Sequence, residues 1–214
     1  MADLIPTKEE MKKALEERHG KENQDKFSTA VVAICGLGGL GSNIAICLAR
    51  AGVGKLILID FDRVDITNLH RQQYKADQVG TYKTNALEEN LKEIAPYIEL
   101  DTHTVRITKD NAMKFLKEAD IICEAFDKAE NKAMLTNFIL KKMPEKYLVA
   151  ASGMAGFGSA NTIQTRMVMK HFYLCGDEVS DVEEEMGLVS SRVMLCAAHQ
   201  AHMVLRILVN ELEP

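Results

Sequence analysis

The chain has 214 residues, 47% hydrophobic and 27% charged, a composition typical of an ordinary soluble domain with one well-buried core. Its 26 basic and 31 acidic residues give a net charge of −5, which argues against nucleic-acid binding through a basic surface. No apolar run reaches the about 18 residues of a membrane span, and the N-terminal segment is too charged for a signal peptide. We therefore expect a cytoplasmic protein without a membrane or nucleic-acid partner.

The cysteines stand apart from one another, and most of them lie inside apolar runs. They are Cys35, Cys47, Cys123, Cys175 and Cys196. Their odd number and single spacing argue against disulfides and against the paired cysteines of a structural zinc site. We expect no zinc; the alternative is a site that joins one cysteine to His171, His199 or His202.

Residues 1–27 are predicted to form an N-terminal helical arm. Thr7 and Glu10 have the spacing of a capping box, and the helical pattern continues through Met11 toward Gly20. The simplest role for this arm is packing.

The most informative stretch begins with an apolar run over residues 30–35 and closes with Asp60. Between them lie a glycine turn, a small-residue helical segment over residues 42–51 and a second apolar run over residues 56–59. The turn contains Gly36, Gly38, Gly39 and Gly41. This order, with an acid about twenty residues after the glycines, is typical of the mononucleotide-binding half of a doubly wound α/β fold.

Each part of this stretch suits a bound nucleotide. Gly36 permits a sharp turn, Gly38 lets backbone N–H groups approach an anion, and Gly41 lets helix and strand pack closely. The helix N-terminus offers unpaired donors and about half a positive charge to a phosphate. Asp60 can accept hydrogen bonds from two ribose hydroxyls.

Helices and strands then alternate along the chain. Residues 82–94, 110–117 and 129–142 are predicted helices, and residues 98–107, 119–125 and 147–151 are predicted strands. The pattern indicates an α/β fold of the doubly wound, Rossmann-like kind, with a mostly parallel sheet and helices on both faces.

Two side chains in this part are candidates for a ligand site. Lys83 lies in the first turn of its helix, where a cation gains nothing from the helix dipole, so we expect it to serve a ligand. Asp127 stands just past the end of a buried strand, where open α/β sheets bind their ligands. It could instead cap the helix that begins at Ala129, and the two roles are compatible.

The last part of the chain is predicted to add a short antiparallel extension, made of strands over residues 161–169 and 172–174. A long apolar helix over residues 187–212 follows, for core or dimer packing. The small-residue loop over residues 152–158 could line a channel for an extended peptide or merely connect strands. Because no linker or repeat interrupts the pattern, we expect one domain over the whole chain.

The residues after Asp60 carry a resemblance to a known family. The run from Asp60 to Gln72 reads DFDRVDITNLHRQ and is similar to the signature of the ThiF/MoeB/HesA family, relatives of the ubiquitin-activating enzymes. Val79-Gly80-x-x-Lys83, NLKEIAP at residues 90–96 and Asp127 match further motifs in order. The resemblance covers about residues 24–211, and a short chain without paired cysteines resembles most the compact second ThiF group, which acts on the sulfur carrier ThiS.

The resemblance implies a nucleotidyltransferase. Such an enzyme uses ATP and Mg²⁺ to adenylate the C-terminal Gly-Gly carboxylate of a small ubiquitin-like sulfur carrier protein and releases pyrophosphate. The compact group indicates a ThiS-like carrier in thiamine thiazole biosynthesis. The resemblance also implies a homodimer.

Family membership would divide the single adenylating domain into three parts. These are the arm over residues 1–27, a nucleotide-binding half over residues 28–145 and a carrier-binding and dimer half over residues 146–214. The acidic segment over residues 177–185 would then be either a solvated loop or a mobile crossover segment that closes over the carrier tail.

The family's nucleotide-binding residues carry over position by position. The glycines Gly36, Gly38, Gly39 and Gly41 would cradle the nucleotide. Asp60 would hold the ribose, and Asp62 would order the loop, with a weaker claim on metal or ribose.

The resemblance assigns the phosphates and the metal to a second group of residues. Asn68, Arg71 and Lys83 would contact phosphates, and Asp127 would hold Mg²⁺. Arg71, Lys83 and Asp127 would be the catalytic residues, since they neutralise charge on the departing pyrophosphate.

Two further positions match family features less closely. Arg18 is the only arginine before Arg50, so it is the candidate for the N-terminal arginine that in relatives crosses to the partner subunit and touches its ATP. Cys175 is the candidate for the cysteine that in some relatives forms a covalent link to the carrier, although no Lys or Arg is near it in sequence to lower its pKa.

Two other functions stay open. A non-catalytic scaffold that binds a ubiquitin-like tail would be marked by loss of a phosphate-binding or metal-binding residue. All four of these residues, Asn68, Arg71, Lys83 and Asp127, are present. An NAD(P)-dependent oxidoreductase would account for the glycine turn and Asp60, but would leave Asn68, Arg71, Lys83 and Asp127 unexplained.

Overall fold

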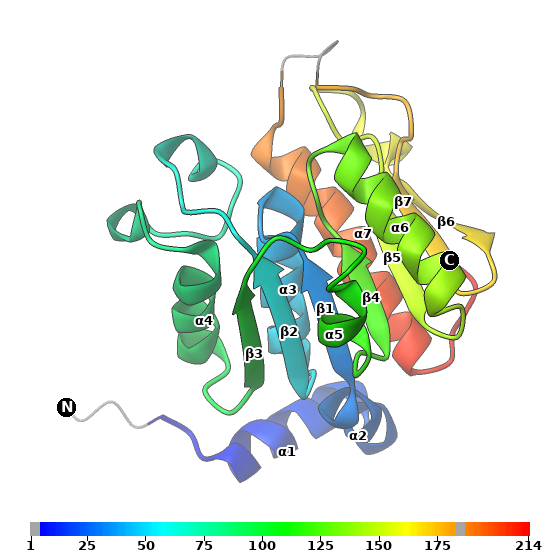
Figure 1. Cartoon of the computed structure of the whole chain (residues 1–214). Coiled ribbons are helices and arrows are strands. Elements are labelled where there is room, and N and C mark those ends of the chain that lie inside the picture. Colours follow the sequence, from blue (N-terminus) through cyan, green and yellow to red (C-terminus); the bar gives the residue numbers. More distant parts are fainter. Residues whose placement is uncertain (1–4, 183–186) are drawn as a thin grey trace.

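Within residues 5–182 and 187–214, which the computed structural model describes, seven strands form one sheet in the order β3-β2-β1-β4-β5-β7-β6 (Figure 1). The strands are β1 (Val31–Cys35), β2 (Lys55–Asp60), β3 (Glu99–Thr104), β4 (Ile121–Glu124), β5 (Tyr147–Ala151), β6 (Gln164–Met169) and β7 (Phe172–Gly176). Neighbouring strands run parallel except for β6, which pairs antiparallel with β7. The predicted parallel sheet with an antiparallel C-terminal extension is confirmed.

Helices cover both faces of the sheet because the central strands are apolar on both sides. Val32 and Ile34 point to the face covered by α3 (Gly39–Ala51), α4 (Lys83–Ile94) and α7 (Ser190–Leu208). Ala33 and Cys35 point to the opposite face, covered by α5 (Ala112–Leu116) and α6 (Ala129–Lys142). Alternate residues of a strand face opposite ways, so one strand contributes to two cores, and the doubly wound prediction is confirmed.

The N-terminal arm consists of two helices. α1 (Lys8–His19) starts with the predicted capping box between Thr7 and Glu10, and α2 (Lys21–Thr29) leads directly into β1. Gly20 separates the two helices with φ 79°, a backbone conformation that glycine adopts without strain. The second helix was not predicted, because only two of its residues, Gln24 and Phe27, are buried. Figure 1 shows both helices at the end of the sheet opposite to the loops that follow β1 and β2.

The predicted boundaries differ from the observed ones mainly at helix ends. α3 begins at Gly39, before the predicted residue 42, because the glycines themselves form its first turn. α7 ends at Leu208, before the predicted residue 212, where Asn210 adopts a left-handed φ of 66°. Residues 183–185 of the predicted acidic segment over residues 177–185 lie outside the described residues. Across the described ranges, no helix is both long and apolar enough to span a bilayer.

Candidate functional site

The glycine turn lies at the carboxyl edge of the sheet, between β1 and α3. A Cβ on Gly36, which has φ 93°, would lie 2.7 Å from the carbonyl oxygen of Ala125. A Cβ on Gly41 would lie 1.8 Å from the carbonyl oxygen of Gly36. Neither position has room for a side chain, so backbone alone faces the space beyond β1. The N-terminus of α3 opens onto this turn behind Gly38, and its first N–H groups have no intrahelical acceptor.

Asp60 ends β2 and holds two loops. Its Oδ2 accepts a hydrogen bond from the Leu37 N–H at 2.6 Å, and its Oδ1 accepts one from the Asp62 N–H at 2.8 Å. The side chain is buried, yet each carboxylate oxygen keeps a second lone pair for a ligand hydroxyl. Asp60 therefore joins the glycine turn to the following loop and still has acceptors for a ribose.

A capped turn that includes Asn68 leads to Arg71, which lies beside the glycines. The 3₁₀ turn Ile66–Asn68 has a reciprocal cap, since Asp65 accepts from the Thr67 N–H at 2.8 Å and donates its own N–H to Asn68 Oδ1 at 3.2 Å. The Arg71 carbonyl accepts from Asn43 of α3 at 3.2 Å. The aliphatic stem of Arg71 lies against Gly39, which brings its guanidinium to the helix N-terminus.

The guanidinium of Arg71 is only partly satisfied. One Nη donates to the Thr67 carbonyl at 3.1 Å and lies 2.9 Å from His70 Nε2, whereas Nε is buried without a partner among the described residues. Burial lowers the pKa of Arg71, and the negative charge of Asp127 opposes that shift. A buried donor without an acceptor is costly, so an anion that reached Nε would remove this cost.

Lys83 is a buried cation at the start of α4. Its Nζ lies 3.2 Å from Asp62 Oδ2, and its N–H donates to the Asp62 carbonyl at 2.9 Å. Only 6% of the residue is exposed. Asp62 thus serves as the counter-ion of Lys83, and the pair fixes the loop between β2 and α4.

Asp127 follows β4 at the same edge of the sheet. The residue is exposed, and no hydrogen-bond partner for its carboxylate is found in the described parts of the chain. The N-cap of α6 is Lys128, and no side chain caps this helix. The reading of Asp127 as a helix cap is therefore wrong. Its carboxylate is free to bind a ligand near Arg71.

These residues come from three connections, β1–α3, β2–α4 and β4–α6, and contacts link them into one site. Only Arg18 lies elsewhere: it is exposed on α1, at the opposite end of the sheet (Figure 1). Within one chain, Arg18 is not brought together with the other predicted residues.

Several residues of the site were missed in the sequence. Tyr74 donates a hydrogen bond from its hydroxyl to the Leu37 carbonyl at 2.6 Å and so fixes the glycine turn. Burial raises the pKa of Tyr74 well above its usual value, with help from the nearby Asp60 charge. The buried Glu124, which precedes Asp127, forms an ion pair with the half-buried Lys132, which follows it. A carboxylate at the end of an apolar strand was a usable signal for Glu124; nothing local marked Tyr74.

A second missed pair, Arg192 and Asp177, joins the loops beside the site. Arg192 of α7 donates to the carbonyls of Gly158 and Ser159, both at 2.7 Å, and forms a buried ion pair with Asp177. The Ala155 N–H donates to Ser180, and Ser180 in turn donates to Asp177. One buried cation thus organises the loop after β5 and the segment after β7.

Exposed apolar side chains lie on these two organised loops. Phe157 is 75% exposed and Val179 is 84% exposed. An apolar surface held on a fixed backbone is typical of a protein-binding site.

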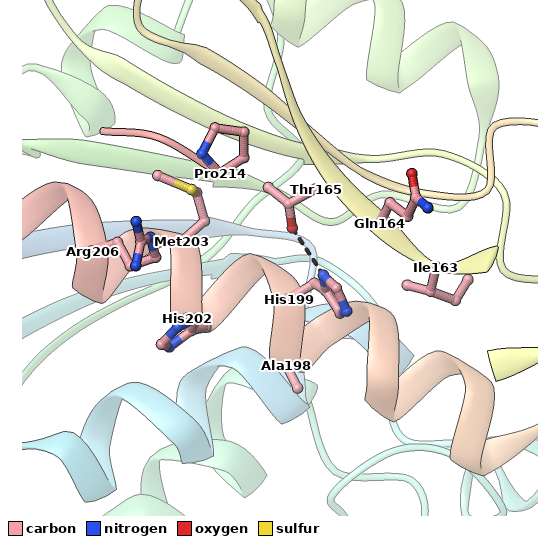
Figure 2. A pocket seen from close by; sticks show the side chains of 9 residues that line it. All are labelled: Ile163, Gln164, Thr165, Ala198, His199, His202, Met203, Arg206 and Pro214. Atoms are coloured by element: carbon pink, nitrogen blue, oxygen red, sulfur yellow. Dashed lines mark hydrogen bonds between the residues drawn. The ribbon is translucent and has the colours of Figure 1, made fainter. Parts of the chain in front are cut away.

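Cys175 lies away from solvent, in β7. Burial raises the pKa of its thiol to about 12, and its Sγ lies 3.5 Å from Thr165 Oγ1. Thr165 in turn lies 2.9 Å from His199 Nδ1, at a surface pocket of about 640 Å³ between β6 and α7 (Figure 2). In the described ranges, no three His, Cys, Asp or Glu side chains are grouped to hold a metal ion. The burial that raises the pKa of the Cys175 thiol disfavours its thiolate, the form that reacts as a nucleophile.

Comparisons with known proteins identify the family of this chain and several relatives. The model of the ThiF family matches residues 11–214. Adenylyltransferase and sulfurtransferase MOCS3 of Aedes aegypti is 36% identical over 126 residues, which are 58% of this chain and 29% of that protein. The sulfur carrier protein adenylyltransferase of Thermus thermophilus is 35% identical over 109 residues, 50% of this chain and 40% of that protein.

Among solved structures, the E. coli tRNA N6-threonylcarbamoyladenosine dehydratase TcdA, crystallised in complex with ATP, superposes with a TM-score of 0.85 at 20% identity. The match covers 97% of this chain and 98% of TcdA. At this identity the likeness concerns the fold. The matched segments span 29% and 40% of the two relatives' lengths.

Proposed function

The chain belongs to the ThiF family, and we propose that it is an adenylyltransferase that uses ATP to activate the C-terminal carboxylate of a small ubiquitin-like sulfur carrier. One observation carries the proposal. Asp60, Arg71 and Lys83, from the connection between β2 and α4, and Asp127, from the loop after β4, converge beside a glycine turn that has no room for a side chain. The relatives' names, which include a sulfur carrier protein adenylyltransferase, support the same activity.

The residues suit this reaction because it needs charge rather than a proton carrier. A terminal carboxylate has a pKa of about 3.5, so it is already an anion at neutral pH and requires no general base. Its approach to a highly anionic triphosphate requires cations and alignment. Arg71, with a buried N–H that lacks an acceptor, and Lys83, at a helix N-terminus, supply that charge.

The donor set at Asp127 fits Mg²⁺. This ion prefers oxygen ligands, keeps several waters and is commonly held by one or two carboxylates together with substrate phosphates. Asp127 offers an exposed carboxylate with no protein partner in the described residues. Bound there with ATP, Mg²⁺ would neutralise phosphate charge. Asp127 would hold the ion, while Asp60 orients the ribose and the backbone of Gly38 and Gly39 meets the phosphates.

The carrier tail is proposed to enter beside the loop over residues 152–158. Arg192 fixes this loop through two carbonyls, and Phe157 stands out from it into solvent. A ThiS-like carrier of thiamine thiazole biosynthesis is the carrier that we propose. The Gly-Gly end suits the site because residues without side chains can pass a narrow channel to reach the α-phosphate.

A homodimer belongs to the proposal as well. Arg18 lies on α1, at the end of the sheet opposite to the glycine turn, so its proposed role at ATP involves a second copy of the chain. Sedimentation at working concentration is expected to give a mass of a dimer; the mass of a monomer would remove Arg18 from the site.

The proposal is tested by ATP–pyrophosphate exchange. A Gly-Gly-ended carrier is expected to support exchange, and the same carrier without its last two residues is expected to support none. A scaffold would instead bind the carrier tail without exchange. An oxidoreductase would bind NAD in calorimetry and show no response to Mg-ATP.

A further inference from the structure

An ion pair between the buried Glu124 and the half-buried Lys132 lies behind the loop that carries Asp127. Lys132 of α6 places its Nζ 3.2 and 3.1 Å from the two carboxylate oxygens of Glu124, the last residue of β4. Only 1% of Glu124 is exposed. Burial raises the pKa of Glu124, and the Lys132 ammonium opposes the shift.

The pair fixes the backbone that leads to Asp127. Glu124 Oε1 accepts a hydrogen bond from the Phe126 N–H at 2.7 Å, so the carboxylate clamps the loop one residue before Asp127. The Ala125 N–H donates to the Cys35 carbonyl at 2.9 Å, and the Ala125 carbonyl faces Gly36. The loop is therefore held against the glycine turn on one side and by Glu124 on the other.

The same ammonium also reaches the neighbouring strand. Lys132 donates to the Ala151 carbonyl at 3.0 Å, at the end of β5 where the loop over residues 152–158 begins. From the other face of the sheet, Gln200 of α7 donates to the carbonyls of Glu124 at 3.0 Å and Val149 at 3.1 Å. Two side chains, the half-buried Lys132 from one face and the buried Gln200 from the other, thus connect the ends of β4 and β5.

Stability alone is a poor explanation for such a pair. Removing two charges from water costs several kcal/mol, which their attraction commonly does no more than offset, so well-packed apolar residues would serve the core as well. What a carboxylate and an ammonium add is a defined direction for each hydrogen bond. Here those bonds fix two loops at the carboxyl edge of the sheet. The loop after β4 would serve Mg-ATP, and the loop after β5 would serve the carrier tail.

We propose that Glu124 and Lys132 are positioning residues. They orient Asp127 toward the metal, and they hold the loop after β4 in register with the loop over residues 152–158. The inference rests on the proposed function, because it takes Asp127 as the Mg²⁺ ligand. Neither residue contacts substrate. Lys132 acts on the metal through Glu124 and the Phe126 N–H, and on the carrier tail through Ala151.

The test compares Lys132→Met with Lys132→Arg and with Lys141→Met, a matched loss of an exposed lysine on the same helix. Binding of Mn²⁺ in the presence of a non-hydrolysable ATP analogue is followed by electron paramagnetic resonance, which needs no carrier and no turnover. Lys132→Met is expected to weaken Mn²⁺ binding about tenfold or more, the scale of losing a partner of a metal ligand. Lys132→Arg is expected to retain most of the affinity, and Lys141→Met all of it.

A double variant separates positioning from general damage. If Lys132 acts through Asp127, combining Lys132→Met with Asp127→Asn is expected to weaken Mn²⁺ binding little more than Asp127→Asn does alone. Independent, multiplying effects would overturn the proposal. So would unchanged Mn²⁺ affinity in a Lys132→Met protein that melts at a lower temperature, because the pair would then be structural only.

Glu124→Gln covers the case in which Lys132→Met fails to fold. Its amide oxygen can still accept from the Phe126 N–H while the charge is lost, and Mn²⁺ binding is expected to weaken less than in Lys132→Met. A Glu124→Gln protein with stronger Mn²⁺ binding than the unmodified chain would contradict the proposal. If no carrier supports exchange, the proposed function fails, yet the Mn²⁺ titration still reads the positioning role separately.

Discussion

Around the glycine turn, the Asp127 carboxylate has no hydrogen-bond partner in the described residues, whereas farther along the same edge Arg192 and Asp177 bind each other. Beside Arg192 and Asp177, the exposed groups are apolar, with Phe157 and Val179 in solvent. The first region leaves charge available for a charged ligand. The second uses its charges internally to hold an apolar surface. The difference suits a small anion on one side and a polypeptide on the other.

The largest expected effect is the loss of stability when the Arg192–Asp177 pair is broken. Arg192→Met leaves Asp177 charged and largely buried, and removing one member of a buried pair costs about 3–5 kcal/mol. Denaturant unfolding is expected to show this loss, and Asp177→Asn in the same chain is expected to restore part of it. Equal stability of Arg192→Met and the unmodified chain would show that the second region does not depend on its internal charges.

The next effect concerns the first region and falls on catalysis. Arg71→Ala, Lys83→Ala and Asp127→Ala are each expected to slow ATP–pyrophosphate exchange about 10²-fold, or about 3 kcal/mol of barrier. Unfolding free energies are expected to change far less than in Arg192→Met. Lys92→Ala, an exposed lysine on the same helix as Lys83, is the control and should exchange normally. Normal exchange in the Arg71 and Lys83 variants would refute their roles.

A smaller effect is expected at the apolar surface. Phe157→Ala is expected to raise the KM for the carrier about tenfold, since an interface anchor contributes about 1–2 kcal/mol, and to leave the KM for ATP unchanged. Ile66→Ala removes an equally exposed side chain from the loop after β2 and serves as the control. Steady-state kinetics with each substrate varied would measure both KM values. An equal rise in the KM for the carrier in Phe157→Ala and Ile66→Ala would contradict a specific role of Phe157.

The smallest effect is expected at Cys175. Because its thiol is buried and burial raises its pKa to about 12, Cys175→Ala is expected to exchange within about twofold of the unmodified chain. Exchange lost in this variant but normal in Arg71→Ala would reverse the assigned roles.

Local sequence patterns predicted the region around the glycine turn better than the region around Arg192 and Asp177. The glycines, Asp60, Arg71 and Lys83 occur within fifty residues, so their order along the chain already implied one edge of a sheet. Strand alternation in β1 likewise implied two covered faces. The spatial order of the strands is a tertiary property that no local pattern reports.

The pairs of the second region could not be predicted for the same reason. Arg192 binds carbonyls more than thirty residues away, and backbone acceptors have no sequence signature. Lys132 looked like any charged residue on a helix until β4 and β5 were seen to end on either side of it. α2 was missed because a short helix with two buried residues has no clear period.

The contact between Gly41 and Gly36 also bears on how a deep mutational scan of this chain would read. Any substitution at Gly41 puts a Cβ onto a carbonyl oxygen 1.8 Å away, so such variants are expected to be depleted for want of folded protein. Variants at Asp127, an exposed residue, are expected to be depleted while remaining abundant in the cell. Measuring abundance alongside fitness would therefore separate two neighbouring sets of intolerant positions, which a fitness score alone would merge.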